Sequence, residues 1–256
     1  MDNRDILNIA MEQSAYDLNC EIDDFLSEKN VIVPYKRNDK VKKYYEEPII
    51  CSMVSYGNNI VAAVRDDIRD IVEEYLGKFE FYHCFEVPNM HWLNERLEVK
   101  GYRICYMSEY YLPDMRLLKP LKCEYELKLL EQKDFTNLYK EEWSNALCEK
   151  RKELDVLGVG AYDNEKLAGL AGCSADADKM LQIGVDVLTE YRRKGIAASL
   201  TSTLALEIIK RDKVPFYCTA WSNIRSVKNA VKSGFIPTWI EMSVKPVEEV
   251  NKLNKG

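Results

Sequence analysis

An Arg-x-x-Gly-x-Ala sequence at a strand-to-helix junction is the feature that most constrains this chain. Arg192, Gly195 and Ala197 occupy its fixed positions. The run before it, residues 180–188, is strand-like, and residues 197–210 after it have apolar side chains at helical spacing. Gly195 lets the backbone come close to a ligand, and the free N–H groups and dipole at a helix start favour an anion. The junction therefore predicts a cradle for a phosphate-bearing ligand.

Alternating strand-like and helix-like runs along the chain predict an α/β fold with a mixed sheet. Pro113, Pro120 and the basic stretch of residues 116–122 predict a linker. The expected domains are therefore an N-terminal accessory α/β domain over residues 1–122 and a second domain over residues 123–256. Strands are expected at residues 49–56, 60–64, 79–85, 102–112, 125–130, 157–162, 167–173, 180–188, 214–221 and 235–244, and helices at residues 10–29, 66–76, 90–99, 133–139, 197–210 and 223–232.

The two halves of the chain share one order of features. Residues 79–102 and residues 214–235 each follow the order strand, asparagine, helix, glycine-aromatic, strand. One hypothesis is that the N-terminal half is a degenerate copy of the C-terminal architecture. The alternative is that two unrelated α/β segments contain the same common unit.

Composition excludes several classes of partner. The formal net charge is −6 and the isoelectric point is near 5.3, which argues against non-specific nucleic-acid binding because that requires a basic surface. Eight cysteines without a Cys-x-x-Cys pair, together with only two histidines, predict buried thiols in a cytoplasmic protein and no metal site. The polar N-terminus is not a signal peptide, and no apolar run is long enough to predict a membrane span.

From about Cys123 onward, the chain resembles the GNAT superfamily of N-acetyltransferases. The resemblance is based on the Arg-x-x-Gly-x-Ala sequence between a strand and an amphipathic helix. It also includes the following strand, then Asn223, then a helix that closes on Gly234 and Phe235. It covers roughly half of the chain and implies a GNAT acyltransferase fold there, with acetyl-CoA as the cosubstrate.

The resemblance also implies where acetyl-CoA binds. The cofactor would lie between two splayed central strands, with backbone groups of Val187 holding the pantetheine arm and backbone amides after Arg192 holding the pyrophosphate. Arg192, Arg193 and Lys194 are candidate phosphate contacts, each with a solvated charge as its alternative. Asn223 is a helix cap by its position and a candidate cofactor contact by resemblance. The cofactor-binding candidates are Val187, Arg192, Arg193, Lys194, Gly195, Ile196, Ala197, Ala198 and Asn223.

Acetylation of an amine needs a base for the ammonium proton, and an acid can protonate the leaving thiolate. Asp186 and Glu241 are the candidate bases, each with a salt-bridged or solvated carboxylate as the alternative. Many family members carry a tyrosine that acts as this acid, seven residues after the asparagine, but that position here is Ala230. Tyr217 is a candidate acid in its place.

The expected function is transfer of an acetyl group from acetyl-CoA to an amine by direct attack. The acceptor is a small molecule or a peptide, and the sequence leaves open whether it is a protein, a small amine, an amino acid or an antibiotic. The alternative is a CoA-binding sensor or interaction protein without catalysis, which Ala230 favours. The N-terminal half is not expected to bind CoA, because its corresponding junction at residues 64–69 is acidic and lacks glycine.

Overall fold

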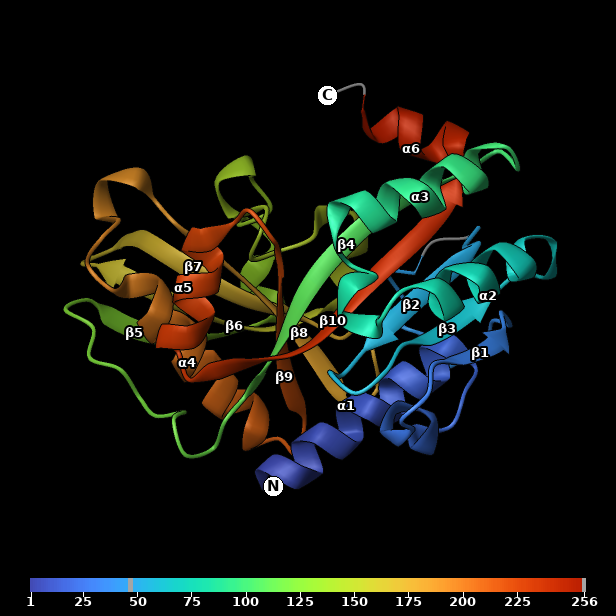
Figure 1. The fold of residues 1–256 in the computed structure, drawn as a ribbon. Coiled ribbons are helices and arrows are strands. Elements are labelled where there is room, and N and C mark those ends of the chain that lie inside the picture. Colours follow the sequence, from blue (N-terminus) through green and yellow to red (C-terminus); the bar gives the residue numbers. More distant parts are fainter. Residues whose placement is uncertain (46–47, 255–256) are drawn as a thin grey trace. The chain divides into compact units, whose positions relative to one another are not determined.

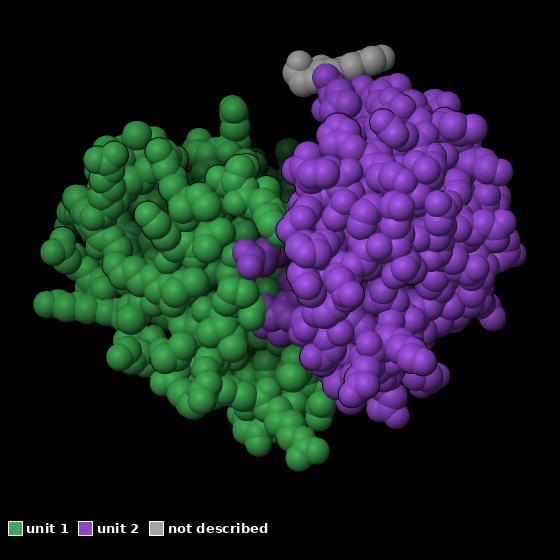
Figure 2. All heavy atoms as spheres, viewed as in Figure 1, with its two compact units in different colours: residues 1–10, 110–237 green, residues 11–109, 238–256 purple. Residues whose placement is uncertain are grey.

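The computed structural model describes residues 1–45 and 48–254, which form two compact units (Figures 1 and 2). Unit 1 comprises residues 1–10 and 110–237, and unit 2 comprises residues 11–109 and 238–256. Three elements pass from one unit into the other along the chain: α1 (Asn3–Leu18), β4 (Tyr102–Pro113) and β10 (Phe235–Pro246). The two units do not correspond to one boundary at residue 122. Residues 1–10 belong to unit 1, and the chain returns to unit 2 within its last strand.

Unit 1 is built on a mixed sheet with the strand order β4-β9-β8-β7-β6-β5. The pairs β5/β6, β6/β7 and β7/β8 are antiparallel, whereas β8 and β9 are parallel. Besides β4, the elements are β5 (Glu126–Glu131), η4 (Gln132–Phe135), η5 (Glu141–Trp143), η6 (Glu149–Leu154), β6 (Asp155–Asp163), β7 (Lys166–Ser174), β8 (Met180–Val187), η7 (Thr189–Tyr191), α4 (Ile196–Ile209), β9 (Val214–Ala220) and α5 (Ile224–Lys232).

Two helices lie against one face of this sheet, as Figure 1 shows for α4 and α5. The buried face of α4 presents Ile196, Leu200, Leu204 and Ile208, which repeat at helical spacing and pack against strand residues such as Ile183. The short 3-10 turns between β5 and β6 contribute a separate buried cluster that includes Trp143 and Phe135. The central strands are therefore covered by helices on one face and by these turns on the other.

Unit 2 has the strand order β1-β3-β2-β10-β4. A buried cluster joins β2, β3 and β10 to two helices through residues such as Met53, Val72 and Leu93. Ser14 on α1 shares a hydrogen bond with the hydroxyl of Tyr56. The ring of Phe25, in the 3-10 turn after α1, packs edge-on against the ring of Tyr56. The remaining elements are η1 (Ile22–Leu26), β1 (Val31–Pro34), β2 (Cys51–Ser55), β3 (Val61–Val64), η2 (Asp66–Ile68), α2 (Arg69–Lys78), η3 (Phe81–His83), α3 (Val87–Glu98) and α6 (Val247–Leu253).

Most predicted elements are present, and the exceptions have local causes. Residues 79–85 were expected to form a strand, but they contain the 3-10 turn η3 instead, because Phe79 packs its ring on Tyr75 and Trp92. The N-terminal half therefore lacks the first strand of the order that suggested an internal repeat. Gly77 lies inside α2 rather than after its end, and residues 133–139 form short 3-10 structure rather than a helix.

Candidate functional site

Strands β8 and β9 pair only where they begin. Three pairs join them, from Met180 opposite Val214 to Gln182 opposite Phe216. Beyond these pairs β8 continues to Val187 and β9 to Ala220, and no further pairing joins these described residues. The two strands therefore part in the middle of the sheet, which opens an unpaired gap between their second halves.

The hydrogen-bond pattern shows which backbone groups face this gap. The N–H of Leu188 donates to the carbonyl of Ala168 on β7, and the carbonyl of Lys179 accepts from Val214 on β9. Because antiparallel ladders alternate, even-numbered residues of β8 bond to β7 and odd-numbered residues turn toward β9. Val185 and Val187 thus direct their N–H and C=O groups toward the gap.

The loop that follows β8 forms an anion cradle. Gly195 is the N-cap of α4 with a φ of +81°, and Arg193 also has a positive φ, of +64°. None of the described residues accepts a hydrogen bond from the N–H groups of residues 193–198. Six consecutive donors thus lie at the positive end of a 14-residue helix, an arrangement that favours an anion. The cradle is the arrangement that the sequence motif predicts.

Two of the three basic side chains of the motif have partners in the loop and its surroundings, whereas the third, Arg193, is exposed. The Arg192 Nε atom donates to the carbonyl of Val187 at 3.0 Å. The Lys194 ammonium donates to the Tyr125 hydroxyl at 2.7 Å and lies 5.4 Å from the ring centres of both Tyr125 and Tyr191. A cation that sequence reasoning missed lies closer to the cradle: the Nζ of Lys232 is 3.6 Å from where a Cβ on Gly195 would be.

The helix after β9 carries the next candidates. The Asn223 side chain caps α5 by accepting from the N–H of Ser226 at 3.2 Å. The hydroxyl of Tyr217 shares a 2.9 Å hydrogen bond with the Ser226 hydroxyl, and burial raises the pKa of Tyr217. Ala230 is completely buried beside Tyr217 in the same cluster. Tyr217 therefore projects from the parted segment of β9 toward α5, and it stays protonated at neutral pH.

Asp186 holds a loop against the sheet. Its carboxylate accepts hydrogen bonds from the N–H of Asn145 at 2.8 Å, from the side chain of Asn145 at 2.6 Å and from the N–H of Ala146 at 3.0 Å. Two glycines make this close approach feasible, because a Cβ on Gly184 would lie 1.7 Å from the carbonyl oxygen of Asn145 and one on Gly172 would lie 2.2 Å from that of Ala146. Both carboxylate oxygens of Asp186 are thus engaged by this loop.

Glu241, the other candidate base, belongs to unit 2, whereas Asp186 belongs to unit 1. It is only 6% exposed, and burial raises its pKa although Lys42 and the Tyr45 hydroxyl act in the opposite direction. Its Oε1 accepts from the hydroxyls of Tyr45 and Ser52, while its Oε2 has no hydrogen-bond partner among the described residues. Glu241 is thus enclosed by unit 2, where hydroxyl groups and burial define its surroundings.

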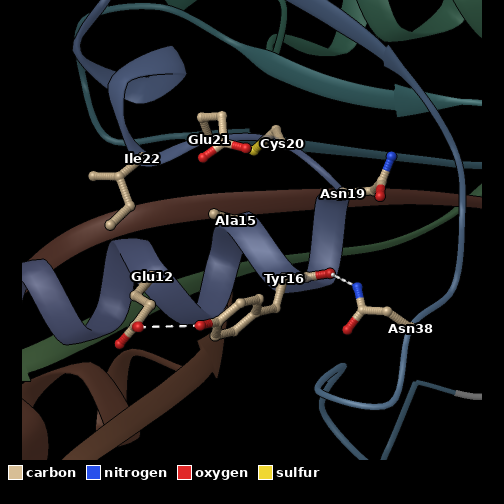
Figure 3. A pocket seen from close by; sticks show the side chains of 8 residues that line it. All are labelled: Glu12, Ala15, Tyr16, Asn19, Cys20, Glu21, Ile22 and Asn38. Atoms are coloured by element: carbon tan, nitrogen blue, oxygen red, sulfur yellow. Dashed lines mark hydrogen bonds between the residues drawn. The ribbon is translucent and has the colours of Figure 1, made fainter.

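Unit 2 also contains a pocket of about 390 Å³ between α1 and the segments that follow it (Figure 3). Tyr16 and Glu12 share a 3.1 Å hydrogen bond on its wall, and Asn38 donates to the carbonyl of Tyr16. None of the predicted site residues lines it.

The described residues contain no group of three or more His, Cys, Asp or Glu side chains suited to a metal ion. All eight cysteines are free thiols, and no helix in the described part of the chain is long and apolar enough to cross a bilayer.

Comparison with known proteins identifies the family. A family model for GNAT acetyltransferase matches residues 89–238, which is more than half of the chain. The match includes β8, the cradle, α4, β9 and α5. A search of curated proteins finds no match.

Several solved structures are similar to the chain. A GCN5-related N-acetyltransferase-like protein from Streptococcus suis is 20% identical, with 60% of this chain and 67% of that one covered and a TM-score of 0.45. An acetyltransferase from the GNAT family of Colwellia psychrerythraea is 15% identical, with 59% and 61% covered and a TM-score of 0.41. A GCN5-related N-acetyltransferase from Sphaerobacter thermophilus is 13% identical, with 73% and 72% covered and a TM-score of 0.45. At these identities the likeness concerns the fold alone.

Proposed function

The chain belongs to the GNAT acetyltransferase family, and from that premise we propose that it transfers an acetyl group from acetyl-CoA to an amine. The observation that carries the proposal is the set of six unpartnered N–H groups over residues 193–198, next to the gap between β8 and β9. Bound acetyl-CoA supplies the acyl group as a thioester. We further propose that the acyl donor is acetyl-CoA, that the acceptor is an amine and that the protein is cytoplasmic.

The described residues fit a CoA-type ligand in two respects. The cradle offers donors without acceptors, which is the chemistry that a pyrophosphate satisfies. The gap offers the backbone groups of Val185 and the N–H of Val187, which are suited to the amides of a pantetheine arm, while the Val187 carbonyl already accepts from Arg192. A backbone N–H in this gap is also placed to polarise a carbonyl, as donors in an oxyanion hole do. Asn223 caps α5, and we assign it that role.

Acid and base functions are assigned from the bonding of each side chain. We propose Tyr217 as the acid, because it belongs to the parted segment of β9, its hydroxyl reaches Ser226 on α5, and its raised pKa keeps it protonated. We propose that Asp186 positions the loop at Asn145 and Ala146, because its oxygens already accept three hydrogen bonds. Glu241 is assigned a structural role in unit 2, because it is buried there and accepts hydrogen bonds from the hydroxyls of Tyr45 and Ser52.

A second candidate function is binding of CoA without catalysis. Ala230 favours this function, because it places a buried methyl group where many family members have a tyrosine that acts as the acid. Both functions require the cradle, so only turnover separates them.

The test is release of free CoA thiol from acetyl-CoA in the presence of a panel of small amines, amino acids and peptides. Saturable release that depends on one class of amine, with a matching acetylated product by mass spectrometry, is the expected result. Binding of acetyl-CoA without release by any amine would support the sensor. Absence of both binding and release would exclude both functions.

A further inference from the structure

The ammonium of Lys232 lies at the mouth of the anion cradle. It comes from the last residue of α5, and its Nζ is 3.6 Å from the position of a Cβ on Gly195. No other atom outside the neighbouring residues comes within 4 Å of that position. The space above Gly195 is therefore open except for this cation.

Packing of α5 against α4 fixes where Lys232 can reach. The Ser233 hydroxyl, next to Lys232, donates to the carbonyl of Ala198 in the first turn of α4. One turn earlier, the side-chain amide of Asn229 donates to the Thr201 hydroxyl at 3.0 Å. The end of α5 is thus held beside the beginning of α4, so Lys232 and the free N–H groups converge from two different helices.

Two of the three cations of the sequence motif are less available than Lys232, whereas the third, Arg193, is exposed as Lys232 is. Lys194 is held by Tyr125 and by two aromatic rings, and Arg192 is held by the carbonyl of Val187. Lys232 is exposed and has no hydrogen-bond or ion-pair partner among the described residues. The ammonium and the unsatisfied N–H donors both repel cations. For the same reason, both attract a dianionic group.

We propose that Lys232 is a direct side-chain contact to the pyrophosphate of the CoA-type ligand, a role that Arg192 and Lys194, held in the loop, do not fill. The inference rests on the proposed function for the nature of the ligand. The ammonium of Lys232, at the end of α5, then contributes positive charge that neutralises the pyrophosphate. The roles left to Arg192 and Lys194 are to fix the loop: one ties it to the end of β8, and the other ties it to Tyr125 before β5.

The test compares the dissociation constants of acetyl-CoA, dephospho-CoA, ADP and pantetheine by calorimetry at low salt. Lys232→Ala should weaken binding of the three pyrophosphate ligands about fivefold to tenfold and leave pantetheine unchanged. The loss should shrink as salt is added. Lys232→Arg should restore most of the affinity because it keeps the charge. Lys150→Ala is the matched control: it removes an equally exposed lysine near the start of β6, at the opposite end of the sheet from the cradle.

Different outcomes separate this inference from the proposed function. If the wild-type protein binds acetyl-CoA but Lys232→Ala binds it equally well, the inference is wrong and the proposed function stands. A larger loss in Lys194→Ala than in Lys232→Ala would also overturn it. If the wild-type protein binds ADP and pyrophosphate, with the loss in Lys232→Ala, but not CoA or acetyl-CoA, the cation assignment stands and the proposed function fails.

Discussion

Adding one methyl group at Gly184 should destabilise unit 1 because no space exists for it. The Cβ of an alanine there would lie 1.7 Å from the carbonyl oxygen of Asn145 and 2.7 Å from its carbonyl carbon. Both are backbone atoms, so no side-chain rotation can relieve the clash. The contact must lengthen to about 3 Å or more, which requires the Asn145–Ala146 backbone to move away from β8.

That movement breaks hydrogen bonds to a charged group. Asp186 accepts three hydrogen bonds from Asn145 and Ala146, at 2.6–3.0 Å. A hydrogen bond to a charged group contributes about 1.5–3 kcal/mol, and overpacking typically costs about 1–3 kcal/mol. Asp186 is partly exposed, so water replaces some of what is lost. We expect Gly184→Ala to lower the free energy of unfolding by about 2–4 kcal/mol.

Urea unfolding followed by far-ultraviolet circular dichroism measures this change, with Gly77→Ala as the control. Gly77 lies inside α2, and nothing lies within 4 Å of its Cβ position. Alanine there should stabilise the protein by about 0.5–1 kcal/mol. The cost of Gly184→Ala should also fall by about 1–2 kcal/mol when Asp186→Ala has already released the loop. Equal stabilities of the two glycine variants would refute the proposed role of the loop contact.

Three further variants test other parts of the site and its surroundings. Tyr217→Phe should lower kcat about 10- to 100-fold in the amine assay and leave the dissociation constant of acetyl-CoA unchanged; an unchanged kcat would remove Tyr217 as the acid. Asp155 is 1% exposed, and burial raises its pKa to about 6, so stability should fall as pH rises from about 4 to 6. Asp155→Asn should remove up to about 3 kcal/mol of that pH dependence in urea titrations, and parallel curves for both proteins would contradict this. The hydroxyl of Thr219 is buried and has no partner in the described part of the chain, so Thr219→Val should raise stability by about 1 kcal/mol, whereas a lower melting temperature would show that the hydroxyl is satisfied.

The sequence predicted the parts of the site that depend on local structure. The cradle follows from Gly195, whose φ of +81° suits glycine, and from the helix that begins after it. The cap at Asn223 and the left-handed Gly234 are confirmed, because capping and positive φ are properties of a few neighbouring residues. The apolar spacing of α4 predicted Ile196, Leu200, Leu204 and Ile208 as buried, but Ser199, Thr201 and Ser202 are buried as well.

Long-range contacts could not be predicted in this way. Lys232 reaches Gly195 only because α5 ends beside the start of α4, which no spacing in the sequence reveals. Asp186 resembles a free carboxylate in the sequence, and its loop partner lies 41 residues earlier. Glu241 alternates with apolar residues as a solvent-facing strand residue would, yet the hydroxyls of Tyr45 and Ser52 bind it inside unit 2.

The most direct test of the acetyl-CoA site is thermal unfolding of the protein with and without acetyl-CoA. At a ligand concentration about 100 times its dissociation constant, binding to the folded state should add about 2.7 kcal/mol and raise the melting temperature by roughly 5–10 °C. Gly195→Asp should abolish the shift, because a carboxylate at the cradle would repel the phosphates. No shift in the wild-type protein at millimolar acetyl-CoA, or an equal shift in Gly195→Asp, would contradict the assignment of this cradle to the cofactor.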